Sequence, residues 1–228
     1  METIRITHDR YNRKLATIFI GSESQVEIDN SDYYMAILVV DTKTGKVMDR
    51  LKKIARSLSD KKVFTIAIFI TDHYDWTFDN SLIFGISTWT TTTTTKEAEN
   101  IVDDINALIT SDAPVALDLA DIKTILYKNE GRRFYYGVGT SNDNNLKTAI
   151  DSAVDKAKGT GMDVYECSKY LIAFNCKSGL SKEKMHELTT LIDDLSDKHK
   201  GNFEFKWGLL PPADKDANSL KFILIAAH

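Results

Sequence analysis

Cysteine, proline and long apolar runs are all scarce in this sequence. It contains two cysteines and three prolines among 228 residues. Cys167 and Cys176 are too few for a disulfide framework or a zinc site, and such usage is typical of a reducing compartment. No apolar run approaches the roughly 20 residues that a membrane-spanning helix needs, and the first residues lack the apolar core of a signal peptide. We therefore expect a soluble, cytoplasmic protein with no membrane partner.

A strong excess of charge of one sign is also missing. Lysine and arginine total 29, and aspartate and glutamate total 33, which gives a formal net charge of −4. The basic residues are interleaved with acidic ones, whereas nucleic-acid-binding domains usually gather them in one patch. Nucleic acid is therefore not expected as a partner. Hydrophobic residues make up 43% of the chain, which is enough for a substantial core in one large or two small domains.

The N-terminal part of the chain predicts four strands and a helix between the last two. Apolar residues at 4–6 and 15–20 predict two strands around a polar turn, as a hairpin or a pair of edge strands. An apolar strand at 34–40, an amphipathic helix at 45–59 and a second apolar strand at 63–70 then predict a βαβ unit. Both of its strands are nearly continuous in apolar residues, as parallel strands covered on two faces should be.

The middle of the chain predicts the end of this sheet and a long helix. A further short strand is expected at 81–87. We interpret the threonine run at 90–95 as the connection that ends the sheet, because β-branched residues have poor helix propensity. Residues 96–109 carry apolar side chains at three- and four-residue spacing, which predicts an amphipathic helix between the two halves.

The second half predicts an α+β unit with mixed strands. Ser181 precedes the last helix and is expected to be its N-cap. The expected helices are a short one that ends at 127 and longer ones at 144–158 and 185–195, and the expected strands are at 133–138, 170–176, 203–209 and 220–226.

The stretch Ala116-Leu117-Asp118-Leu119-Ala120-Asp121 places two carboxylates three residues apart at an expected helix start. Asp118 as N-cap and Asp121 three residues later would satisfy free backbone amides, much as a capping box does. Acidic side chains at this end also interact favourably with the helix dipole. On spacing alone, a structural role is the simpler interpretation.

Four stretches of the second half, taken in order, resemble the FtsZ/tubulin superfamily. The first resembles the end of the family's central helix with its catalytic loop, and the second resembles its glycine-containing strand with the helix after it. The third resembles the strand and turn before the last helix, and the fourth resembles the closing hairpin. They are residues 105–109 with 116–122, 136–139 with 144–157, 170–175 with 179–180, and 207–208 with 214–220 and 222–227.

The resemblance implies a fold in three parts. Residues 1–95 would form a truncated Rossmann-like domain, residues 96–110 the central helix, and residues 111–228 an FtsZ/tubulin-like C-terminal α+β domain with a mixed sheet. The whole chain would thus be an α/β protein.

The resemblance also gives the loop a functional interpretation. In the family, the equivalent loop follows the central helix and reaches onto the nucleotide held by the next subunit of a filament. Asp118 and Asp121 are therefore candidate catalytic residues that would act in trans and orient a water or a metal-bound phosphate. The asparagine of the family's loop is replaced here by Ala116.

The nucleotide-binding half departs from the family's pattern. Full members carry one glycine-rich loop after the first strand and another after the fourth. Compared with a typical dinucleotide-fold half, we expect roughly 70 residues before the strand at 34–40, including the first loop, to be absent. The second loop is replaced by Asp41-Thr42-Lys43-Thr44-Gly45-Lys46. The candidate nucleotide-binding residues of this degenerate phosphate loop are Asp41, Thr42, Thr44 and Gly45.

This replacement argues against nucleotide binding. A phosphate cradle needs consecutive backbone N–H groups that point inward, in conformations that glycine reaches without strain. Gly45 alone cannot supply them, and Asp41 would place a like charge near the phosphates. Thr95 stands where the family's central helix has the asparagine that stacks beneath guanine. We therefore expect no GTP or other cofactor, and no enzyme activity that needs an intact GTP pocket.

The segment after the second apolar strand offers two weaker candidates. His73 lies close to two aspartates and could ligate a metal, but a lone histidine with neighbouring acids is more often part of a solvated surface, and no metal site is expected. Tyr74, Trp76 and Phe78 form an aromatic cluster. We interpret it as core or subunit contact, because no basic residues interleave with it.

The leading hypothesis is an FtsZ-like cytoskeletal or cell-division-related assembly or regulatory protein without a competent GTP pocket. It would dock on itself or on a full-length relative through the Asp118/Asp121 loop. Two alternatives stay open. One is a GTPase component that uses these carboxylates in trans on GTP bound to a partner, and the other is a repurposed binding module without filament chemistry.

Overall fold

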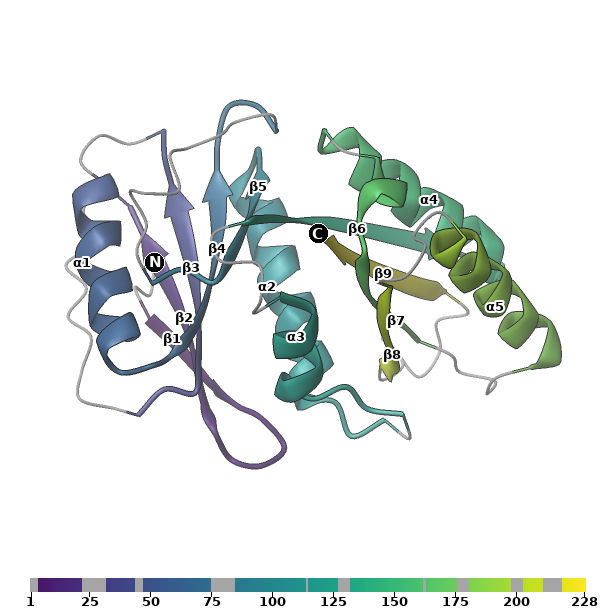
Figure 1. Ribbon diagram of the computed structural model, residues 1–228, viewed down its shortest axis with the longest axis horizontal. Coiled ribbons are helices and arrows are strands. Elements are labelled where there is room, and N and C mark those ends of the chain that lie inside the picture. Colours follow the sequence, from purple (N-terminus) through teal and green to yellow (C-terminus); the bar gives the residue numbers. More distant parts are fainter. Residues whose placement is uncertain are drawn as a thin grey trace. The chain divides into compact units, whose positions relative to one another are not determined.

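The computed structural model places the chain in two compact units (Figure 1). Unit 1 contains Met1–Asn106 and Leu126–Arg133, and unit 2 contains Ala107–Ile125 and Phe134–His228. The three-part division expected from the sequence stays a prediction. The structure describes residues 4–21, 32–43, 47–74, 85–113, 115–126, 132–161, 163–175, 181–197, 203–210 and 219–228.

Unit 1 is built on a mostly parallel sheet. Its strands are β1 (Ile4–His8), β2 (Lys14–Ile20), β3 (Met35–Asp41), β4 (Phe64–Ile70) and β5 (Thr88–Thr92). β1 pairs with β2 in the antiparallel direction, and β2, β3, β4 and β5 then pair in parallel in this order. The hairpin and the parallel βαβ unit expected from the sequence are confirmed. The first two residues of the next strand, Arg132 and Arg133, extend the parallel pairing beyond β5.

Two helices accompany this sheet. The crossover helix α1 (Val47–Asp60) packs on β2, β3 and β4 (Figure 1). Its apolar residues recur at three- and four-residue spacing, so one face of the helix is buried. These buried residues are Val47, Leu51, Ile54, Ala55 and Leu58. The long helix α2 (Thr95–Thr110) confirms the amphipathic helix expected after the threonine run, and it begins in unit 1 and ends in unit 2.

The interpretation of the threonine run as a connection is wrong. Residues 88–92 form β5, and its four threonines are at most 2% exposed. The branching at Cβ that lowers helix propensity also favours a strand, where such side chains pack well. A buried hydroxyl needs a partner, and Thr91 Oγ1 finds one by donating to the backbone oxygen of Tyr74 over 2.9 Å. The strand expected at 81–87 lies largely outside the described residues, and its described part, 85–87, is not a strand.

Unit 2 is built on a mixed sheet, as expected. Its strands are β6 (Arg132–Ser141), β7 (Lys169–Asn175), β8 (Glu204–Leu210) and β9 (Leu220–Ala227). In space the order is β6, β9, β7, β8. β9 is antiparallel to both of its neighbours, whereas β7 and β8 are parallel.

The helices of unit 2 begin at defined caps. The expected N-cap Ser181 is confirmed, since its hydroxyl accepts the backbone N–H of Lys184 over 3.3 Å. Asn145 caps the preceding helix by accepting the N–H of Thr148 over 3.0 Å.

No helix of the described stretches is long and apolar enough to cross a membrane. The helices are α3 (Leu119–Leu126), α4 (Leu146–Gly159), α5 (Lys182–Ser196) and the short 3-10 helix η3 (Val164–Glu166).

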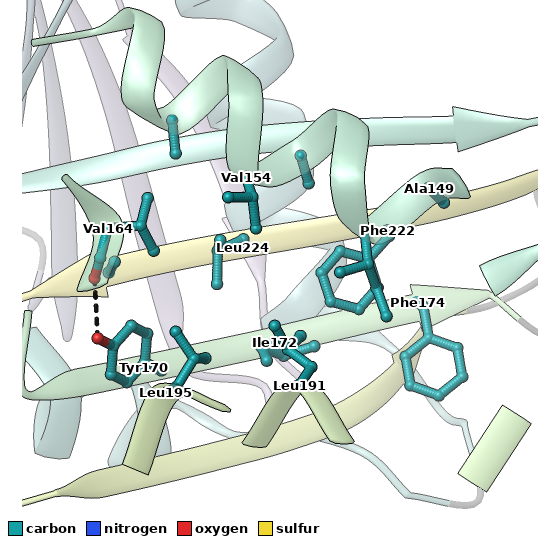
Figure 2. Close-up of a cluster of buried hydrophobic side chains, with 14 of the residues drawn as sticks. Ala149, Val154, Val164, Tyr170, Ile172, Phe174, Leu191, Leu195, Phe222 and Leu224 are labelled. Carbon is teal, nitrogen blue, oxygen red and sulfur yellow. Dashed lines mark hydrogen bonds between the residues drawn. The ribbon is translucent and has the colours of Figure 1, made fainter. Parts of the chain in front are cut away.

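The core of unit 2 lies between its sheet and the helices α4 and α5 (Figure 2). Phe174 and Phe222 stack with ring centroids 6.2 Å apart. The hydroxyl of Tyr170 is fully buried and donates to the backbone oxygen of Val164 over 2.8 Å, so its polar atom is satisfied. Burial raises the pKa of the Cys167 thiol to about 12, and this cysteine packs as a small apolar residue, as expected. Cys176 lies outside the described residues.

Candidate functional site

A reciprocal pair of hydrogen bonds closes the start of α3. The backbone N–H of Asp121 donates to Oδ1 of Asp118, and the backbone N–H of Asp118 donates to Oδ2 of Asp121, each over 3.0 Å. Asp118 is therefore the N-cap and Asp121 the third helical residue of a capping box. The structural role expected from the spacing is confirmed.

A lysine from β8 forms an ion pair with the carboxylate of Asp121. Lys206 Nζ lies 3.1 Å from Oδ1 of Asp121, and the two side chains are 40% and 26% exposed. Each oxygen of Asp121 thus has a donor, one from the backbone and one from a cation. Sequence reasoning missed Lys206, because nothing local links a strand residue to a loop so far away in the chain.

The segment that leads into α3 is also fixed on β8. The backbone N–H of Leu209 donates to the oxygen of Val115 over 2.7 Å. At Gly208 there is no room for a side chain, because a Cβ would lie 2.7 Å from Leu117 Cγ and 2.9 Å from the oxygen of Val115. Leu117 is itself only 3% exposed. We call residues 115–121 together with Lys206, Gly208 and Leu209 the loop platform.

The polar groups of the loop platform are held by contacts within the protein. Both oxygens of Asp121 and Oδ1 of Asp118 already interact with donors inside the protein, and these contacts fix the orientation of both side chains. Ala120 is exposed between the two carboxylates. The result is a rigid surface with two acidic groups and one basic group on it. A catalytic role for the two aspartates stays a prediction.

The exit of β3, where the sequence predicted a degenerate phosphate loop, is described up to Lys43; Thr44 and Gly45 lie outside the described residues. Oδ1 of Asp41 accepts the backbone N–H of Lys43 over 3.1 Å. The backbone N–H and the hydroxyl of Thr42 both bond to the oxygen of Ile70, over 3.1 and 2.8 Å. The two backbone donors of this turn that the structure describes are therefore already used within the protein.

A carboxylate network that the sequence analysis missed lies where β5 enters α2. Oε2 of Glu97 accepts the hydroxyls of Thr92 and Thr93, over 2.6 and 3.1 Å, and the backbone N–H of Thr93, over 3.1 Å. Its Oε1 accepts the hydroxyl of Tyr74 over 3.0 Å. The hydroxyl of Thr94 in turn accepts the N–H of Glu97 over 3.2 Å, so the sequence pattern of a capping box was the available signal.

The network favours the ionised form of Glu97. Burial opposes ionisation, but the hydrogen bonds from Thr92, Thr93 and Tyr74 together outweigh it, so the pKa of the carboxyl is below its ordinary value of 4.5. A negative charge thus sits at the carboxyl ends of the parallel strands, the edge where α/β folds usually bind ligands. The Glu97 carboxylate accepts hydrogen bonds there from one backbone amide and three hydroxyls.

The other residues singled out in the sequence do not form a common site among the described residues. His73 is exposed, and the described part of the chain contains no group of three or more potential metal ligands. Thr95 is exposed at the first position of α2. The hydroxyl of Tyr74 belongs to the Glu97 network. Trp76 and Phe78 lie outside the described residues, so the aromatic cluster stays a prediction.

Comparison with solved structures identifies the fold. The chain is similar to an empty FtsZ dimer structure from M. jannaschii, with a TM-score of 0.62 and 16% identity over 86% of this chain and 64% of that one. It is also similar to TubZ of Bacillus thuringiensis serovar israelensis in GDP-form protofilaments, with a TM-score of 0.57 and 13% identity over 92% of this chain and 66% of that one. The chain thus spans slightly less than two thirds of the length of these proteins.

These similarities define the class of fold. The protein is an α/β protein with the FtsZ/tubulin-like fold, as the resemblance implied. A helical structure of a two-stranded TubZ filament is a further match, with a TM-score of 0.57. No protein-family model and no curated protein sequence matches the chain.

The close packing at Gly208 gives a first prediction. Gly208→Ala inserts a methyl group against Leu117 and Val115, which should cost about 1 to 3 kcal/mol of unfolding free energy by overpacking. Gly159→Ala is the matched control, because no atom lies within 4 Å of the added Cβ there. Urea denaturation of both variants measures the difference. Equal stability of the two variants would contradict the described packing of the loop platform.

The Glu97 network gives a prediction about pH. Because the pKa of Glu97 is lowered in the folded protein, its contribution to stability is present above pH 4.5 and is lost as the pH falls through the folded-state value. The Glu97→Gln variant lacks this titration. The difference in unfolding free energy between wild type and variant should therefore shrink between about pH 6 and pH 3. A difference that stays constant across this range would show that the network does not hold the charged form.

Proposed function

We propose that this protein is an FtsZ-like assembly or regulatory component that docks through its loop platform. The partner is a second copy of the chain or a longer FtsZ-type protein. The observation that carries the proposal is the rigid loop at the start of α3, which the capping box, Leu209 and Lys206 hold in place on a fold of the FtsZ/TubZ class.

Rigidity supports a contact function. A loop that is already ordered loses little conformational freedom when a partner binds, so more of the contact energy remains as affinity. The platform combines Asp118 and Asp121 with the cation of Lys206, and such mixed charge fixes the register of a partner better than one sign would. The solved proteins with this fold include an FtsZ dimer and TubZ protofilaments, which supports self-association as the first partner to test.

The proposed role does not need bound GTP. At the exit of β3, the amides of Thr42 and Lys43 already bond within the protein. At the exit of β5, the backbone N–H of Thr93 donates to the Glu97 carboxylate and is therefore not available to an anionic ligand. Both turns also carry a carboxylate, which disfavours a phosphate. The ammonium of Lys43 is already engaged there, since it donates to the backbone oxygen of Thr93 over 3.1 Å and lies 3.5 Å from Oδ1 of Asp72. We therefore place the activity in docking and not in nucleotide hydrolysis.

Sedimentation velocity tests the docking surface. Ala120→Arg puts a long charged side chain on the exposed centre of the loop without removing a capping group, and it should abolish the concentration-dependent association of the wild type. Asn100→Arg is the matched control, because Asn100 is exposed on α2 and should tolerate the same side chain without loss of association. In a second experiment, each protein is added to filaments of a longer FtsZ-type protein. The wild type and the Asn100→Arg control should shorten these filaments, and Ala120→Arg should not.

Four outcomes decide the proposal. Loss of association in Ala120→Arg alone supports it. Association that survives in this variant, or absence of both self-association and any effect on filaments, would refute it. Stimulated GTP hydrolysis that depends on Asp118 and Asp121 would instead favour the trans-acting GTPase.

A further inference from the structure

A groove of about 560 Å³ runs between α4 and α5 in unit 2. None of the residues that line it belongs to the loop platform. The two helices lie side by side in Figure 1, and Figure 2 shows Val154 of α4 and Leu191 of α5 on the same core. Its volume is within the range of ligand sites, about 300 to 1,000 Å³. On α4 it extends from Lys147 to Lys158, which is about 16 Å at 1.5 Å per residue.

The floor of this groove is apolar. Ile150, Val154 and Leu191 line it, and each is 6% exposed because it also belongs to the core of unit 2. These side chains leave a narrow apolar strip between the two helices. Such a strip suits the methylene stem of a long side chain, which gains by covering apolar surface while its polar end stays in water.

The walls of the groove are acidic in the middle. Four carboxylates line it, from Asp151 and Asp155 on α4 and from Glu187 and Asp194 on α5. Its two ammonium groups belong to Lys147 and Lys158 and stand at the two ends of the α4 side.

Two of the four carboxylates already have a partner within the protein. Lys147 Nζ lies 3.1 Å from Oδ2 of Asp151, and Oε2 of Glu187 accepts the backbone N–H of Lys147 over 3.1 Å. The ammonium of Lys158 lies 5.0 Å from the centre of the Tyr165 ring. Asp155 and Asp194 have no ion-pair partner among the described residues, so the groove presents two uncompensated carboxylates above its apolar strip.

We propose that the α4/α5 groove binds a lysine- or arginine-rich segment of a partner protein. The aliphatic stems of the basic side chains cover Ile150, Val154 and Leu191, and their charged ends pair with Asp155 and Asp194. A groove of about 16 Å accommodates roughly three turns of helix, which favours a peptide segment over a small cation. The site does not depend on the loop platform, so the protein can hold two partners.

A fluorescent peptide tests the proposal on the whole protein. The probe is a twelve-residue helical peptide of leucine, lysine and arginine, and its control has glutamate at every basic position. The basic peptide should bind, and raised salt should weaken its binding because the pairs are exposed. The double variant Asp155→Asn/Asp194→Asn should lower the affinity about three- to tenfold, as expected for two exposed charge pairs.

The matched control removes two charges elsewhere. Asp60→Asn/Asp193→Asn changes the net charge equally, at exposed positions that do not line the groove, and should keep the wild-type affinity. Circular dichroism melting of both double variants verifies that they fold. Equal affinity of the two variants, or equal binding of the basic and acidic peptides, would overturn the proposal. Spermine binding as tight as that of the basic peptide would also overturn it, because the groove would then be a site for small cations.

Discussion

The first backbone amides of a helix have no partner within the helix and need an acceptor from a side chain, water or a ligand, and this constraint shapes the loop at α3. At α3, Asp118 and Asp121 meet it with side chains that would otherwise be free for chemistry. The loop they close is then fixed to β8 through Leu209 and Lys206. The same two carboxylates that make the loop resemble a catalytic element therefore also hold it in place, and this is why the function we propose for it is contact.

Backbone amides also need acceptors in the turns at the carboxyl ends of the parallel strands in unit 1. There Asp41 and Glu97 accept backbone amides of their own turns, and Glu97 also takes three hydroxyls. A protein that holds a phosphate at this edge leaves such donors for the ligand. In this chain, the carboxylates of Asp41 and Glu97 occupy these donors. The loss of the family's glycine-rich loop is thus accompanied by a specific set of internal hydrogen bonds.

Sequence reasoning succeeded where structure is set by local patterns. Apolar runs and spacing gave the hairpin, the βαβ unit, the cap at Ser181 and the capping box of Asp118 and Asp121. It failed where a local preference is ambiguous, since the threonines of β5 suit a strand as well as a loop. It could not find contacts set by the tertiary fold, such as Lys206 with Asp121 or Tyr74 with Glu97. Those contacts decide what the candidate sites can do.

The central claim is that this FtsZ-like protein acts by docking, without bound guanine nucleotide. Titration calorimetry of the purified protein with GTP and Mg²⁺ tests it most directly, after nucleotide carried through purification has been measured by absorbance and chromatography. The account predicts no co-purified nucleotide and no saturable heat up to about 1 mM GTP, which corresponds to less than about 4 kcal/mol of binding free energy. Stoichiometric co-purified GDP or GTP, or micromolar binding, would contradict it.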